Sequence, residues 1–133
     1  MNEVIGRGAT RIALRVSRDR NRRLLADLLA DHDIVDITDT VPGETDLCIV
    51  DDRGLTRIAT ALTDWKHDQQ PTYAPVLLLS ESSRTNPLKR YGGRLGEQID
   101  AIQPIPAPKM AIRTRVESLL ETRRYSEELA SER

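Results

Sequence analysis

The chain has 133 residues, which fits a single domain, and 38% of them are hydrophobic, with phenylalanine absent. Its 20 basic residues nearly cancel its 21 acidic ones, which argues against a protein that coats nucleic acid over its whole surface. The charge is uneven, however: residues 7–23 hold seven arginines and one acid, whereas residues 24–108 hold seven basic residues and 14 acids. We therefore expect partners to bind at local surfaces.

Cysteine usage and hydropathy predict a cytoplasmic protein. Cys48 is the single cysteine, which excludes a disulfide framework and a zinc site built from cysteines. Residues 1–10 lack the apolar stretch of a signal peptide. The longest uncharged run, residues 69–80, is shorter than the roughly 20 apolar residues that cross a membrane, so no membrane partner is expected.

In chain order, short apolar segments alternate with helical patterns. The segments predicted to be strands are residues 11–16, 33–38, 46–50, 75–80 and 101–105. Leucines four residues apart predict a helix over residues 20–31, and the spacing from Leu55 to Trp65 predicts a second helix that Pro71 ends. Residues 82–98, interrupted by proline and glycine, predict a short or irregular helix. Apolar residues after Pro108 predict a last helix.

This alternation predicts an α/β fold of the doubly wound type, with a five-stranded parallel sheet and helices on both faces. One connection is irregular, because only residues 39–45 separate the second and third predicted strands. A parallel crossover usually needs a dozen residues or more. Either the helix between these strands is vestigial, or the second strand pairs antiparallel or poorly.

Functional groups of an open parallel sheet gather beyond the carboxyl ends of its strands. The first strand has no glycine before the next helix, which excludes a glycine-rich dinucleotide fingerprint and a P-loop. The residues at the predicted strand ends are Ser17, Arg18, Asp19, Asp51, Asp52, Ser80, Glu81, Ser82, Gln103 and Pro104. We expect the functional site among these side chains.

These strand ends resemble response-regulator receiver (CheY-like) domains. The run from Asp46 to Asp51 resembles their third strand, whose last aspartate accepts a phosphoryl group from a histidine kinase. Residues 75–80 resemble the fourth strand, which ends in the switch residue, here Ser80. Residues 21–29 are similar to the first helix and residues 99–105 to the fifth strand. The resemblance covers residues 10–124 and implies a flavodoxin-like fold.

The resemblance implies Asp51 as the phosphoacceptor and Ser80 as the residue that contacts the phosphoryl group. It also implies a Mg²⁺ site, for which Asp19 and Asp51 are the candidate ligands. Receivers place two acids after the first strand, where this chain has Ser17 and Arg18, and they place a lysine where it has Gln103, followed by Pro104. An incomplete set of carboxylates weakens a site for a hard cation. These departures resemble the atypical, pseudo-receiver modules at the N-terminus of some archaeal sensor kinases.

Three functions stay open, none of them enzymatic. The first is a phosphorelay receiver, with a histidine kinase or a downstream signalling domain as partner. The second is a phosphorylation-independent pseudo-receiver for dimerisation or protein interaction, in which Arg18 pairs with Asp51 in place of a metal ion. The third is anion or nucleic-acid binding through the arginines of residues 18–23. A carboxylate at the end of a strand can also simply cap the next helix, which is the structural alternative for Asp51.

The expected organisation is an N-terminal tail of residues 1–9, a receiver-like domain of residues 10–124 and a charged helical extension or linker of residues 125–133. Acids and bases alternate along the last segment, after the apolar face of the helix thins at Leu120. Charged helices that outrun their apolar stripe often lead into a coiled coil or a further domain. A homodimer is therefore among the expected partners.

Overall fold

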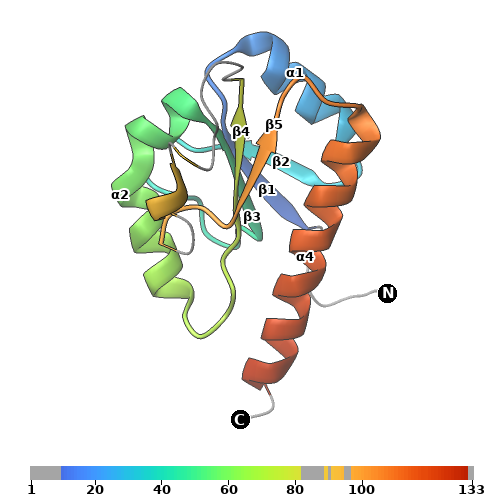
Figure 1. The fold of residues 1–133 in the computed structure, drawn as a ribbon. Coiled ribbons are helices and arrows are strands. Elements are labelled where there is room, and N and C mark those ends of the chain that lie inside the picture. Colours follow the sequence, from blue (N-terminus) through green and yellow to red (C-terminus); the bar gives the residue numbers. More distant parts are fainter. Residues whose placement is uncertain (1–9, 82–88, 90, 95–96, 132–133) are drawn as a thin grey trace.

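The computed structural model describes residues 10–81, 89, 91–94 and 97–131. Five parallel strands form one sheet in the order β2-β1-β3-β4-β5 (Figure 1). The strands are β1 (Arg11–Arg15), β2 (Asp33–Asp36), β3 (Leu47–Asp51), β4 (Val76–Ser80) and β5 (Ala101–Pro104). Every residue of β3 and β4 is buried, as their consecutive apolar residues predict for strands covered on both faces. The prediction of a flavodoxin-like α/β fold is confirmed.

Helices cover both faces of this sheet. One face packs against α1 (Asp19–Leu28) and α4 (Lys109–Ser131), and the other against α2 (Asp52–Gln69). A 3₁₀ turn, η1 (Gly92–Arg94), lies within the segment predicted to be irregular, most of which falls outside the described residues. Within the part of the chain that the structure describes, no helix combines the length and the apolar character needed to cross a bilayer.

The irregular connection between β2 and β3 keeps the parallel arrangement. β2 pairs in parallel with β1 at the edge of the sheet, with Arg11 opposite Asp33, so the antiparallel alternative is wrong. Residues 37–46 cross to β3 without forming a helix. Ile37 is buried and Val41 packs against the same core, so two side chains of the crossover cover apolar surface there. The vestigial-helix alternative is the one observed.

A buried ion pair fastens the second half of α4 to the sheet. Arg123 and Asp46 are 6% and 4% exposed, and Nε of Arg123 lies 3.1 Å from Oδ1 of Asp46. The same guanidinium donates to the carbonyl of Tyr73 and to Oε1 of Gln69. Oδ2 of Asp46 accepts the backbone N–H of Arg11 at 2.9 Å. One carboxylate therefore joins α4, the start of β3 and the start of β1.

We expect Arg123→Leu to lower the free energy of unfolding by about 3 kcal/mol, because the buried Asp46 loses its guanidinium partner and the contacts to Tyr73 and Gln69 are lost as well. Urea denaturation measures the change. Arg124→Leu is the matched control, since Arg124 is the exposed neighbour on the same helix and its loss should change stability by less than about 0.5 kcal/mol. Similar values for the two variants would contradict this account of the ion pair.

Candidate functional site

A pocket of about 350 Å³ opens at the carboxyl edge of the sheet. Its lining comes from the ends of β1, β3 and β4 and from the start of α2, and consists of Ser17, Arg18, Asp51, Asp52, Arg53, Leu79 and Glu81. Of the residues at the predicted strand ends, the pocket brings together Ser17, Arg18, Asp51, Asp52 and Glu81, whereas Asp19, Ser80, Gln103 and Pro104 do not line it and Ser82 lies outside the described residues. The partners of the lining residues, however, differ from those of a phosphorylation site.

Asp51 ends β3 and is the N-cap of α2. Its Oδ1 accepts the backbone N–H of Gly54 at 2.7 Å, and its Oδ2 accepts the backbone N–H of Ser17 at 2.7 Å. The hydroxyl of Ser17 adds a longer contact of 3.4 Å to Oδ1. Asp51 is 8% exposed, so its carboxylate is buried, and both of its oxygens are hydrogen-bonded. Its negative charge also interacts favourably with the dipole at the N-terminus of α2. This arrangement matches the capping alternative.

Gly54 is required by the close approach of α2 to β1. A Cβ atom at this position would lie 1.9 Å from the backbone oxygen of Arg15 and 3.0 Å from Oδ1 of Asp51. Neither atom can move freely, because one belongs to a strand and the other caps the helix. The first turn of α2 therefore packs directly against the end of β1.

Ser80, the predicted switch residue, faces Asp52 instead of Asp51. Its hydroxyl lies 3.5 Å from Oδ1 of Asp52, which also accepts the hydroxyl of the buried Tyr91 at 2.5 Å. Tyr91 was not among the predicted site residues, although it is one of only three tyrosines and so a scarce aromatic group. An aspartate, a serine and a tyrosine thus meet beside the capped Asp51.

Arg18 pairs with Glu81 and not with Asp51. Its Nε lies 3.2 Å from Oε2 of Glu81, and its side chain is 71% exposed. The predicted guanidinium–carboxylate pair in the pocket is therefore not formed, because both Asp51 oxygens are taken by backbone N–H groups and the acid after β4 lies nearer to Arg18. Arg18 still contributes positive charge at the mouth of the pocket.

Gln103 occupies the lysine position of receivers on β5. It lies opposite Leu79 of β4, is 8% exposed, and donates from Nε2 to the carbonyl of Pro104 at 3.0 Å. A neutral amide held by its neighbour supplies no positive charge to a phosphoryl group. The assignment of Gln103 to the position of the missing lysine stays a prediction from the resemblance.

These residues do not fit a Mg²⁺ site of the receiver kind. Asp19 is exposed in the first turn of α1 and does not line the pocket that contains Asp51. The oxygens of Asp51 already accept N–H groups, and the pocket contains two guanidinium groups, from Arg18 and Arg53. Mg²⁺ keeps several waters but needs one or two carboxylates to hold it, and the other acids of this pocket, Asp52 and Glu81, are engaged by Tyr91 and Arg18.

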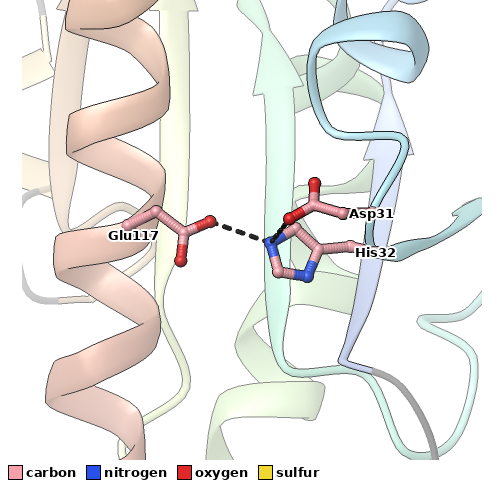
Figure 2. A group of neighbouring side chains, drawn as sticks. All are labelled: Asp31, His32 and Glu117. Atoms are coloured by element: carbon pink, nitrogen blue, oxygen red, sulfur yellow. Dashed lines mark hydrogen bonds and ion pairs between the residues drawn. The ribbon is translucent and has the colours of Figure 1, made fainter.

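Among the described residues, one cluster of three side chains has the spacing of metal ligands: Asp31, His32 and Glu117 (Figure 2). Nε2 of His32 lies 2.8 Å from Glu117 and 3.8 Å from Asp31. Arg113 occupies the cluster already, because its NH1 and NH2 groups contact both oxygens of Asp31 at 2.7 and 2.6 Å. This guanidinium lowers the pKa of Asp31 to about 2. The cluster therefore acts as an ion-pair network between α4 and the turn before β2.

The arginines of α1 are partly neutralised. Arg18 pairs with Glu81, and Arg22 makes two contacts of 2.7 and 2.9 Å to Asp36, which raise the pKa of Arg22. Arg20 and Arg23 remain exposed on the helix. Two of the four charges that favoured anion binding by residues 18–23 are thus used within the protein.

Comparison with known proteins identifies the fold. No protein-family model matches the chain, and no curated protein matches it in sequence. NtrX of Brucella abortus is 17% identical, with a TM-score of 0.68 over 93% of this chain and 29% of NtrX. A CheY-like receiver domain protein of Methanospirillum hungatei is 15% identical, with a TM-score of 0.60 over 89% of this chain and 98% of that protein.

A third structure belongs to a family of redox sensors in the streptococci that evolved from two-component response regulators. It is 14% identical, with a TM-score of 0.63 over 90% of this chain and 54% of that protein. The chain therefore spans 29% of NtrX and 54% of the streptococcal protein. The chain has the fold of CheY-like receiver domains, which confirms the resemblance at the level of the fold.

We expect Gly54→Ala to lower the free energy of unfolding by about 2 kcal/mol, since overpacking of this kind costs about 1–3 kcal/mol. The sign of this change in the free energy of unfolding is informative, because alanine in place of glycine stabilises an unconstrained helix by about 1 kcal/mol. Gly43→Ala is the control, since a Cβ there meets nothing within 4 Å. A stabilised Gly54→Ala protein in urea denaturation would refute the close approach.

Asp31 should titrate with a pKa of about 2 in carbon-detected NMR. Its pKa is lowered in the folded protein, so its contribution to stability is present above about pH 4, the ordinary value, and is lost as the pH falls toward 2. Arg113→Gln should return the pKa toward the ordinary value. Arg115→Gln, an exposed position on the same helix, should leave it unchanged, and an equal response to both variants would contradict the specific pair.

Proposed function

We propose that the chain is a receiver-fold signalling module that works through protein contact without accepting a phosphoryl group. The observation that carries this proposal is the state of Asp51, whose two carboxylate oxygens accept backbone N–H groups at 2.7 Å each. Asp51 ends β3, the strand whose last aspartate is the phosphoacceptor by resemblance to receivers. Here the side chain holds the end of β1 to the start of α2.

Phosphoryl transfer to a carboxylate is a matter of positioning and charge stabilisation. The attacking oxygen must be free to approach phosphorus, and cations must neutralise the transferred group. Phosphorylation of either oxygen of Asp51 would withdraw charge from an oxygen that accepts a backbone N–H, from Ser17 or Gly54, and would weaken that hydrogen bond. The neutral Gln103 and the exposed Asp19 supply neither the lysine nor the acidic pair of a competent site.

The end of α4 supports a role in protein contact. Tyr125 and Leu129 are 61% and 67% exposed and lie four residues apart, so they share one side of the helix. Both belong to the predicted extension of residues 125–133, and α4 continues through it to Ser131. Large, exposed apolar side chains are typical of an interface when the helix continues beyond the residues that pack on the core. A second copy, a histidine kinase or a downstream signalling domain is the proposed partner class.

A phosphorylatable receiver is the second candidate, with Asp51 as acceptor, Ser80 as switch and Mg²⁺ bound through Asp19 and Asp51. It is favoured by the position of Asp51 at the end of β3 and of Ser80 at the end of β4. Redox sensing, the property of the streptococcal protein, finds no support at Cys48, because that thiol is fully buried and burial raises its pKa.

Beryllofluoride with Mg²⁺, followed by amide NMR, tests the two candidates. We expect no shift of the Ser17, Asp51 and Ser80 amides, whereas strong shifts in the wild type and none in Asp51→Asn would establish the phosphorylatable receiver. Asp51→Asn should also lower the free energy of unfolding by about 1–3 kcal/mol, because the amide NH₂ must face an N–H donor. Asp64→Asn, exposed on the same helix, is the matched control for stability.

A further inference from the structure

A second pocket, of about 720 Å³, lies beside the first, where the crossover from β2 to β3 carries no helix. Its walls come from the end of β1, the start of that crossover and the first turns of α2. Three arginines, Arg15, Arg53 and Arg57, line it together with the half-buried Val16 and the exposed Thr38. The volume falls within the range of small-molecule sites, about 300–1,000 Å³.

The arginines of this pocket have no acidic partner among the described residues. Arg53 and Arg57 stand four residues apart in the first two turns of α2, so they lie on one side of the helix. Both are exposed, and neither has an ion pair or a side-chain hydrogen bond within the described structure. Arg15 is half-buried and donates from NH1 to the carbonyl of Ile37 at 2.9 Å, which leaves its charge uncompensated by an acid.

The acids near this pocket are already engaged elsewhere. Asp36, the only acid on its walls among the described residues, makes two contacts to Arg22 of α1. Asp51 is held by backbone N–H groups, and Asp52 accepts the hydroxyls of Ser80 and Tyr91. A net positive pocket therefore remains beside the first two turns of α2.

We propose that this pocket binds the phosphate groups of a small molecule, with a diphosphate held by Arg53 and Arg57 and the rest of the ligand against Val16 and Thr38. Guanidinium groups match phosphate oxygens in planar, bidentate pairs. The proposal uses other residues than the α1 arginines 18–23 and does not depend on whether Asp51 is phosphorylated. It adds an input to a module whose proposed output is protein contact.

Titration calorimetry and amide NMR at low salt test the site with inorganic phosphate, pyrophosphate, UDP and uridine as probes. We expect pyrophosphate or UDP to shift amides of residues 14–17, 36–38 and 53–57, and uridine to shift none. Tighter binding of UDP than of pyrophosphate would identify a nucleotide-type ligand, and equal binding a free phosphate-type anion. Both results support the phosphate site.

Arg53→Gln and Arg57→Gln should each weaken pyrophosphate binding about tenfold, because each removes one charge-assisted contact. Arg23→Gln removes the same charge from the exposed face of α1 and should change affinity less than twofold. All three arginines are exposed, so circular dichroism should show unchanged folding. No binding of pyrophosphate or UDP at 10 mM, or an equal loss in Arg23→Gln, would overturn the proposal, and neither result bears on the beryllofluoride experiment.

Discussion

The carboxylate of Asp51 sets the geometry of the carboxyl edge of the sheet. By accepting N–H groups from Ser17 and Gly54, it fixes the end of β1, the end of β3 and the first turn of α2 relative to one another. This contact brings α2 so close to β1 that only glycine fits at position 54. The same placement directs Arg53 and Arg57 toward the second pocket and Asp52 toward Ser80.

Asp46 holds β1 against β3 in the same way at the other edge of the sheet, where the strands begin. Asp46 precedes β3 as Asp51 ends it, and the two carboxylates accept the N–H groups of Arg11 and Ser17 at the two ends of β1. Asp46 then receives Arg123 from α4, whereas Asp51 caps α2. The two acids of the receiver-like run thus hold β1 against β3 at both ends. A carboxylate used in this way is buried and hydrogen-bonded, which makes it costly to recruit for chemistry.

The strands and helices were predictable because their signals are local: runs of consecutive apolar residues for β3 and β4, and a regular spacing of leucines for α1. The pairing of side chains at the pocket was not. Arg18 is near Asp51 in the predicted topology, yet it pairs with Glu81, because the pairing depends on where this residue, directly after β4, lies in space. Tyr91 reaches Asp52 from a segment whose glycines hide any periodicity. The short connection between β2 and β3 could be recognised in the sequence, but only the structure shows that β2 pairs in parallel and that the connection has no helix.

The short crossover links the two proposals in one physical argument. A receiver-like chain without a helix between β2 and β3 leaves the ends of β1 and β2 open beside the N-terminus of α2. On one side of that N-terminus Asp51 caps the helix and Asp52 accepts two hydroxyl groups, which is the basis of the proposed function without phosphoryl transfer. On the other side Arg53 and Arg57 lack acidic partners among the described residues. The near-neutral total charge therefore hides a local difference. The acids of the first pocket are engaged within the protein, whereas Arg53 and Arg57 of the second pocket have no acidic partner among the described residues. An incoming anion would therefore be attracted to the second pocket.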